Sequence, residues 1–207
     1  MPENYVKWEF ERDRCVLLVV DMQNDFVNGG GLSVCKNAGP QVPAIRKLIA
    51  KCRALGVPVI YTMQESDPRY NPLEAASQPH LKTAGIISGT PGYQIVDELA
   101  PEPGDEIIHK RRFSAFFQTD LEIILRNIRG AERPADTVII CGTVANVCCE
   151  STARDAFFRD YKVVFGTDVN SAKSPEALAA TLRNMENLFG RTMDSDTIIA
   201  SLERGRG

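Results

Sequence analysis

Histidine is scarce in this sequence, which has only His80 and His109 among 207 residues. The six cysteines form no C-x-x-C pair, so the usual spacing of a structural zinc site is missing. Because zinc is most often held by imidazole and thiolate groups, we expect no metal site. The phosphate-binding patterns G-x-G-x-x-G and G-x-x-x-x-G-K-[ST] do not follow any predicted strand, and we expect no cofactor.

Long apolar runs and an excess of one charge are also absent. No stretch approaches the roughly 18 apolar residues that cross a bilayer, and residues 1–14 are too polar for a signal sequence. The formal net charge of -3 provides no general basic field for nucleic acid. The cysteines lie in apolar runs rather than in a disulfide pattern. We expect a cytoplasmic protein with neither nucleic acid nor a membrane as its partner.

The sequence does contain a regular alternation of strand-like and helix-like segments. Its length and its 43% of hydrophobic residues suit one domain that covers residues 1–207. Short apolar runs predict six strands, at 15–20, 57–63, 106–109, 137–141, 162–166 and 191–193. Amphipathic patterns predict helices at 42–55, 120–128, 147–159, 175–188 and 195–202, with Asp120 and Ser195 as N-caps. This alternation predicts a three-layer α/β/α sandwich around a six-stranded, mostly parallel sheet.

Chemically useful side chains follow three of the predicted strands. Asp21 ends the first strand in the phrase DMQNDF, Lys110 ends the third in HKRRFSAFF, and Cys148 follows the fourth in GTVANVCCESTARD. Ligands of open α/β sheets bind outside the carboxyl ends of the strands, where these three residues should meet. A helix start and a nearby lysine favour the thiolate, and a carboxylate can take its proton. The predicted roles are nucleophile for Cys148, base for Asp21 and electrostatic partner for Lys110.

The three phrases, in this order, resemble the cysteine hydrolases of the isochorismatase-like superfamily over nearly the whole chain, from about Cys15 to Leu202. The resemblance implies a Rossmann-like sheet of six parallel strands. It implies hydrolysis of a C–N bond in a small amide, ureido or N-carbamoyl compound through a thioester on Cys148. It also implies a cis peptide between Val144 and Ala145, an oxyanion hole made by the amides of Ala145 and Cys148, and a homodimer or homotetramer.

Two groups of relatives that use other chemistry differ from this chain in their site residues. Zinc-dependent nicotinamidases carry an aspartate and two histidines after the second strand, where residues 64–67 read QESD. Isochorismatases lack the nucleophilic cysteine, so its presence favours amide chemistry. The phrase PGYQIVDELAPEPGD at residues 91–105 is similar to ureidoacrylate amidohydrolases. The candidate substrate-binding residues are polar or line an apolar wall: Asn24, Gln64, Arg112, Phe26, Phe113 and Phe117.

Other interpretations remain open at this point. A lone buried cysteine is most often a core residue, and an aspartate after a strand often caps a turn. Neighbouring helix positions point about 100° apart, so Cys149 is expected in the core when Cys148 faces a pocket. The alternatives are an isochorismatase-type hydrolase of another small metabolite, or a thiol redox sensor on the same fold. Residues 64–92 predict a long loop after a strand end, a place where loops often cover a site.

Overall fold

The computed structural model describes residues 8–28, 35–78, 85–130 and 132–205. A six-stranded sheet lies at its centre, in the order β3-β2-β1-β4-β5-β6, and every neighbouring pair is parallel. The strands are β1 (Cys15–Val20), β2 (Val59–Gln64), β3 (Glu106–Lys110), β4 (Thr137–Thr143), β5 (Lys162–Ser171) and β6 (Arg191–Met193). The predicted six-stranded sheet is therefore confirmed, and its strand order reverses between β1 and β4.

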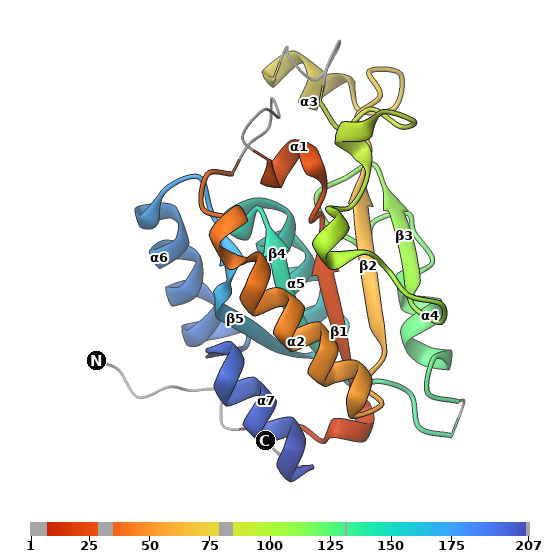
Figure 1. Ribbon diagram of the computed structural model, residues 1–207, viewed down its shortest axis with the longest axis vertical. Coiled ribbons are helices and arrows are strands. Elements are labelled where there is room, and N and C mark those ends of the chain that lie inside the picture. Colours follow the sequence, from red (N-terminus) through yellow and green to blue (C-terminus); the bar gives the residue numbers. More distant parts are fainter. Residues whose placement is uncertain (1–7, 29–34, 79–84, 131, 206–207) are drawn as a thin grey trace.

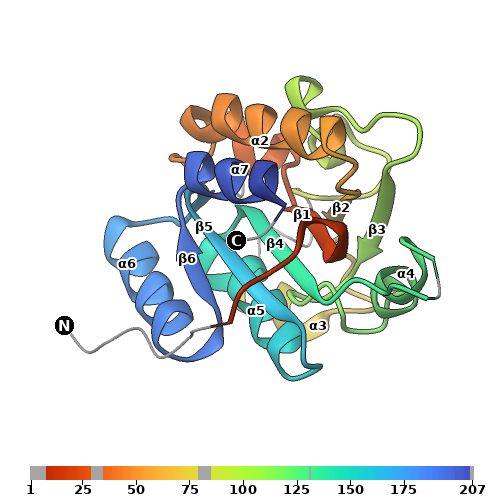
Figure 2. The same cartoon turned by 90° about the horizontal axis from the view of Figure 1, so that it is seen from below.

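Helices cover both faces of the sheet (Figures 1 and 2). One face carries α2 (Val42–Ala54) and α7 (Ser195–Arg204), and the other carries α4 (Leu121–Asn127), α5 (Glu150–Phe157) and α6 (Pro175–Asn184). Alternate residues of a strand point to opposite faces. Thus Leu17 of β1 joins the core beneath α2 and α7, whereas Leu18 joins the core beneath the other three helices. The three-layer sandwich is confirmed.

Short helices fill the connections. They are η1 (Arg12–Arg14), α1 (Asn24–Val27), η2 (Gly39–Gln41), α3 (Pro72–Ser77), η4 (Pro91–Tyr93) and η5 (Asp97–Leu99). The predicted long loop at 64–92 therefore contains helices, and residues 79–84 of it lie outside the described part of the chain. Both α1 and α3 lie at the end of the sheet where β1 and β2 finish (Figure 1). This end is the one at which the sequence places the site.

Two predicted helices contain π-helical turns that their sequence pattern does not predict. The helix predicted at 147–159 begins as a wider π-helical turn, η6 (Ala145–Cys149), before α5 continues it. The helix predicted at 175–188 likewise ends in a π-helical turn, η7 (Met185–Phe189). The predicted N-cap Ser195 is wrong by one residue, because the side chain of Asp194 accepts the hydrogen bond from Thr197 N.

Strand β5 is longer than predicted. It continues five residues past Gly166, and its last residues pair with the end of β4 after a shift of register. Asn170 bridges this irregularity, since its Nδ2 donates to the carbonyl oxygens of Ile140 and Gly166, each at 2.8 Å. The residues after Gly166 are mostly polar, so the sequence does not predict a strand there. The pairing of this part of β5 depends on the side chain of Asn170. The extension carries the chain to the carboxyl edge of the sheet at Lys173.

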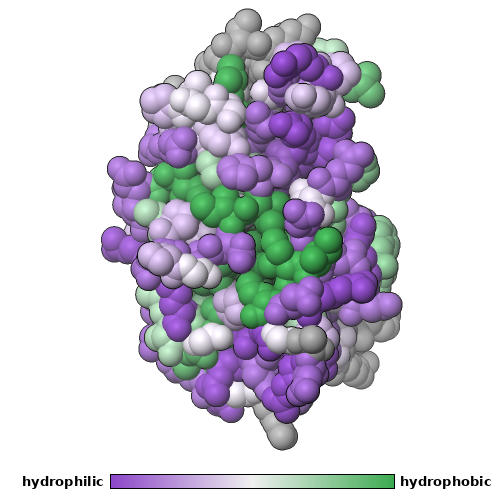
Figure 3. Space-filling model, turned by 90° about the vertical axis from the view of Figure 1, so that its right-hand side faces the viewer, coloured by the Kyte–Doolittle hydropathy of each residue, from purple (hydrophilic) through white to green (hydrophobic). Residues whose placement is uncertain are grey.

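Strand β3 forms one edge of the sheet, with α4 beside it. The face on this side carries an area of hydrophobic side chains between polar regions (Figure 3). The exposed apolar side chains on β3, α4 and the segment between them are Ile107, Phe113, Phe117 and Ile123. The expected homodimer or homotetramer stays a prediction. Among the described residues, no helix is long and apolar enough to cross a membrane.

Candidate active site

The candidate site lies where the strand order reverses. β1 and β4 are neighbours, and their connections leave in opposite directions, which opens a crevice beyond their carboxyl ends. Asp21 directly follows β1, and η6 with Cys148 follows β4. Lys110 reaches this point from the end of β3, past the end of β2. The fold therefore brings together the three residues that the sequence places at separate strand ends.

An ion pair between Lys110 and Asp21 forms the base of the site. Lys110 Nζ lies 2.7 Å from Asp21 Oδ2, and both side chains are 0% exposed. Lys110 Nζ also donates to Gln64 Oε1 at 2.6 Å and to the carbonyl oxygen of Arg112 at 3.2 Å. Thr62 Oγ1 donates to Asp21 Oδ1 at 2.6 Å. Buried charges are tolerated when they are paired and hydrogen-bonded, and this pair meets both conditions.

Asp21 is held by its backbone as well as by its side chain. Its φ is 50°, in the left-handed region that aspartate enters more readily than most residues. Asp21 N donates to the carbonyl oxygen of Thr62 at 3.1 Å, and Thr143 Oγ1 donates to the carbonyl oxygen of Asp21 at 2.9 Å. The neighbouring strands β2 and β4 thus fix the turn after β1. This turn directs the carboxylate toward Lys110 and Cys148.

The lysine is charged in this environment. Burial alone would lower the pKa of Lys110, but the Asp21 carboxylate and the Cys148 sulfur outweigh burial, and the pKa of Lys110 is raised above its ordinary value. An ammonium that stays protonated holds a permanent positive charge beside the sulfur. It therefore acts as an electrostatic partner rather than as a base.

Cys148 lies over this ion pair with 3% of its surface exposed. Burial raises the pKa of the thiol, hydrogen-bonding contact with Lys110 lowers it, contact with Asp21 raises it, and the net shift is upward. Lys110 does lower the pKa of the thiol, as expected, but burial raises it by more, so the net direction is upward. The resting group is a thiol whose proton lies beside a carboxylate, an arrangement that suits a base-activated nucleophile.

The turn that carries Cys148 offers backbone N–H groups. The first N–H groups of a helix have no acceptor within it. The carbonyl oxygen of Val144 accepts from Val147 N at 2.9 Å and from Cys149 N at 3.3 Å. In the described part of the chain, neither Ala145 N nor Cys148 N donates to a side chain or to a carbonyl outside η6. These two N–H groups are consistent with an oxyanion hole.

The predicted position of the cis peptide is wrong by one residue. The cis bond joins Thr143 to Val144, not Val144 to Ala145. Val144 lines the pocket beside Cys148, whereas Ala145 is fully buried in the core. The role of the Ala145 amide stays a prediction.

Cys149 occupies the core, as predicted. It is 0% exposed and belongs to the apolar cluster beneath α4, α5 and α6. Burial is the largest cause that raises the pKa of Cys149 well above its ordinary value, and the sulfur of Cys148 adds to it. The two adjacent thiols therefore differ in surroundings, since only Cys148 lines a pocket.

That pocket, which we call the inner pocket, has a volume of about 140 Å³. Its walls include the predicted residues Gln64, Phe26 and Phe113 together with Cys148. Gln64 is 1% exposed and its orientation is determined by Lys110, because an ammonium only donates and must face Oε1. Gln64 Nε2 then has no hydrogen-bond partner among the described residues. A buried donor without an acceptor beside the nucleophile is suited to a substrate oxygen.

Three other predicted substrate residues lie elsewhere. Asn24 Nδ2 donates to the carbonyl oxygen of Pro91 at 2.9 Å. Asn24 lines neither the inner pocket nor a second cavity that adjoins it beside α3. Phe117 is 48% exposed and also lines neither of these cavities. Arg112 lines the adjoining cavity rather than the inner pocket. Asn24 and Phe117 are therefore not brought to the pocket.

Sequence reasoning missed several residues that shape the site. Gln23 is 0% exposed, accepts from Gln64 N at 2.8 Å and donates to the carbonyl oxygens of Gln64 and Tyr93. It lies within DMQNDF, so its place after a buried strand was the available signal. Thr62, in the middle of an apolar strand, gave no comparable signal. The inner pocket is also lined by Glu74, Gln78, Ile86, Val144, Asn146, Val147 and Lys173.

The arrangement does not resemble a metal centre. In the described ranges, no three His, Cys, Asp or Glu side chains lie together as a bound ion requires. The chemistry available is that of a thiol, a carboxylate, an ammonium and backbone N–H groups around a small pocket. These groups suit nucleophilic attack on a carbonyl carbon.

Comparisons with known proteins identify the family of this chain. Residues 15–197 match the family model described as the Isochorismatase domain. The chain is 33% identical to the ureidoacrylate amidohydrolase RutB of Methylorubrum extorquens over 93% of this chain and 84% of that protein. A crystal structure of a cysteine hydrolase from Pseudomonas syringae pv. phaseolicola superposes with a TM-score of 0.90 at 30% identity, covering 99% of this chain and 100% of that one. The N-carbamoylsarcosine amidase of Thermoplasma acidophilum superposes with a TM-score of 0.74 at 29% identity, covering 88% and 97%.

Proposed function

Because the chain belongs to the isochorismatase family and is a hydrolase of C–N bonds, we propose that it uses Cys148 as its nucleophile and forms a thioester with the substrate. Asp21 serves as the base, and Lys110 stabilises the charges of both. The observation that supports this assignment is the convergence of the three groups. The buried ion pair of Asp21 and Lys110 lies in hydrogen-bonding contact with the one thiol that lines the inner pocket.

The reaction begins when the substrate carbonyl enters the inner pocket. Asp21 takes the proton of the Cys148 thiol, and the sulfur attacks the carbonyl carbon. The resulting oxyanion accepts hydrogen bonds from the N–H group of Cys148 and from the turn that precedes it, with Ala145 as the predicted second donor. When the C–N bond breaks, the leaving nitrogen receives the proton from Asp21 and departs as ammonia or an amine.

Water completes the cycle. Asp21, again unprotonated, takes a proton from a water molecule that attacks the thioester carbon. The C–S bond breaks, the acid or carbamate leaves, and the proton held by Asp21 returns to the sulfur. One water is consumed in each turnover. Lys110 keeps its proton throughout, which agrees with the upward direction of its pKa.

The proposed substrate is a small amide, ureido or N-carbamoyl acid. Two relatives support this class, one named for ureidoacrylate and one for N-carbamoylsarcosine. The inner pocket supports it as well, because its volume of about 140 Å³ suits only a small reacting group. Nε2 of Gln64, which has no hydrogen-bond partner among the described residues, supplies a donor for one oxygen of that group.

Release of ammonia or amine from a panel of N-carbamoyl acids, ureido acids and simple amides tests the proposal. We expect Cys148→Ala to lower kcat by roughly 10⁴-fold or more, as the loss of a nucleophile does in other hydrolases. The matched control is Cys149→Ala, which removes the neighbouring buried thiol and should leave kcat within about twofold. Intact-protein mass spectrometry of the wild type under turnover should show an acyl adduct that Cys148→Ala lacks. Near-full turnover of every accepted substrate by Cys148→Ala would overturn the proposal.

A further inference from the structure

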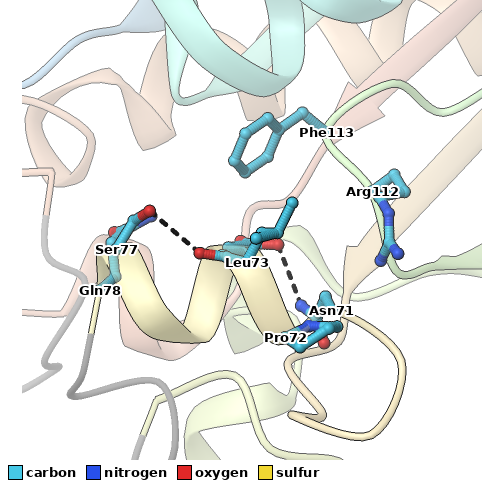
Figure 4. A pocket seen from close by; sticks show the side chains of 8 residues that line it. Asn71, Pro72, Leu73, Ser77, Gln78, Arg112 and Phe113 are labelled. Carbon is cyan, nitrogen blue, oxygen red and sulfur yellow. Dashed lines mark hydrogen bonds between the residues drawn. The ribbon is translucent and has the colours of Figure 1, made fainter.

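A second and larger cavity adjoins the inner pocket. This outer pocket has a volume of about 560 Å³ and is formed by α3 and by the segment after β3 (Figure 4). Glu74, Gln78 and Phe113 line both cavities, so the two share a wall. The inner pocket is smaller than the roughly 300 Å³ at which typical ligand sites begin, whereas the outer pocket lies within their range. A substrate larger than its reacting group has its natural place in the outer pocket.

We infer that the outer pocket is a binding subsite for the remainder of the substrate, namely the apolar side chain and the carboxylate of an N-carbamoyl amino acid. The inference rests on the hydrolase function proposed above, and it adds the part of the substrate that the inner pocket cannot hold. Three features of the outer pocket carry it: an apolar clamp, a cation without an acidic partner, and an acceptor at the boundary of the two cavities.

The apolar clamp consists of Leu73 and Phe113. The two side chains point toward each other across the pocket, Leu73 from α3 and Phe113 from the segment after β3 (Figure 4). Leu73 is 83% exposed and Phe113 is 37% exposed. Covering apolar surface of this kind is favourable, and a branched or aromatic group between the two side chains would cover both.

The position of α3, and with it Leu73, is determined by a small polar network. Asn71 Oδ1 accepts from Asp67 N at 2.9 Å, and Asn71 Nδ2 donates to Glu74 Oε2 at 2.9 Å. Ala75 is 1% exposed and anchors the opposite side of the helix. The exposed leucine is thus presented by an anchored helix rather than by an unconstrained segment.

Arg112 supplies the positive charge. Its Nη1 donates to the carbonyl oxygen of Arg111 at 2.7 Å, and its Nη2 donates to the carbonyl oxygen of Tyr70 at 2.6 Å. The neighbouring arginines differ, because Arg111 pairs with Glu65 and Arg69 pairs with Asp67. In the described part of the chain, Arg112 has no carboxylate within ion-pair distance.

A guanidinium held in place by two carbonyl oxygens and lacking an acid is suited to a carboxylate of the ligand. Glu74 stands at the boundary with the inner pocket, where its carboxylate can accept from a ureido N–H. The nucleophile lines the inner pocket, Glu74 and Phe113 line both cavities, and Leu73 and Arg112 line the outer one. An N-carbamoyl amino acid presents matching groups: a carbonyl carbon, then an N–H, then a side chain and a carboxylate that branch from the same carbon.

Kinetics with three substrates test the inference: N-carbamoylglycine, which has no side chain, N-carbamoylphenylalanine, and the carboxamide of N-carbamoylphenylalanine. We expect Leu73→Ala to lower kcat/KM for N-carbamoylphenylalanine roughly tenfold and to change it less than twofold for N-carbamoylglycine, because only the former contacts the clamp. Leu73→Trp, which fills the cavity, should exclude the phenyl substrates and spare the glycine one. Leu188→Ala is the matched control, since Leu188 is 63% exposed and lines neither cavity.

The charge is tested separately. We expect Arg112→Gln to lower kcat/KM roughly tenfold for N-carbamoylphenylalanine and less than twofold for its carboxamide, with Arg183→Gln on α6 as the control. Equal effects of the Leu73 and Arg112 variants on all substrates, or no effect on any, would overturn the subsite and leave the proposed function standing. No product from any of the three substrates with the wild type would instead overturn the proposed substrate class, and the subsite with it.

Discussion

Replacing Asp21 with asparagine would leave the buried ammonium of Lys110 without its counter-charge while changing the shape of the site very little. The two groups are 2.7 Å apart and completely buried. Removing one partner of such a pair typically costs ~3–5 kcal/mol of unfolding free energy. Lys110 would keep its hydrogen bonds to Gln64 Oε1 and to the carbonyl oxygen of Arg112, so we expect a loss at the lower end, about 3 kcal/mol at pH 7.

The pH dependence of this loss has a definite sign. In the wild type the pKa of Lys110 is raised in the folded state. The stability that the pair contributes is therefore complete below the pKa of the unfolded state, about 10.4, and is lost only as the pH rises through the pKa of the folded state. In Asp21→Asn the carboxylate is gone and burial, which lowers the pKa of Lys110, dominates. Because the pKa of Lys110 is then lower in the folded state than in the unfolded state, the variant gains stability as the pH rises toward about 10.4. The difference between wild type and variant should therefore shrink from pH 7 to pH 10.

Urea unfolding followed by circular dichroism at pH 7, 8, 9 and 10 measures this difference. At the midpoint of thermal unfolding, the same loss corresponds to a fall of roughly 6–12 °C for a chain of this size. The control is Glu203→Gln, which removes the half-exposed partner of Lys51 and should cost less than about 1 kcal/mol. A loss at pH 7 no larger than the control, or a difference that grows toward pH 10, would refute the assignment of a charged, buried pair.

Two further predictions concern the inner pocket and its thiol. Gln64→Glu replaces the Nε2 donor by an oxygen and keeps the acceptor for Lys110. We therefore expect kcat/KM for N-carbamoyl acids to fall roughly tenfold or more. Retention of the wild-type kcat/KM would contradict the proposed contact. Alkylation by iodoacetamide in the empty enzyme should be slow at pH 7 and accelerate with pH, because the pKa of Cys148 is raised. Lys110→Met should slow the alkylation further, since the ammonium of Lys110 lowers the pKa of Cys148. Peptide mass spectrometry should find Cys148 modified rather than Cys149. Faster labelling of the Lys110→Met variant would count against the electrostatic role of Lys110.

The sheet and the three central residues of the candidate site follow from the sequence because their signals are local. A strand that is followed by Asp21, or that ends in Lys110, marks its own carboxyl end, and parallel strands bring such ends to one edge. The helix start just before Cys148 is similarly visible, although the helix begins at Ala145 rather than at the predicted residue 147. Even there the local pattern does not resolve the turn, since the cis bond lies between Thr143 and Val144, one residue before the predicted position.

The parts that escaped prediction depend on contacts between distant segments. Thr62 is a polar residue in an apolar strand, and only the fold shows that it donates to Asp21. Lys173 reaches the inner pocket because β5 continues to Ser171, an extension that requires the bridge made by Asn170. Helix α3 has six residues, too few for a hydrophobic period, so the outer pocket that it lines has no signature in the sequence.

The placement of Lys110 on β3 has a consequence for how the enzyme would lose activity. In the part of the chain that the structure describes, β3 is an edge strand with a partner on one side only, and elements with fewer contacts open at a lower free energy than the core of a sheet. The ammonium that balances the central carboxylate is thus carried by a less supported strand. Local unfolding of β3 would separate Lys110 from Asp21 while β1 and β4 stay folded, so activity would be lost before the whole protein unfolds.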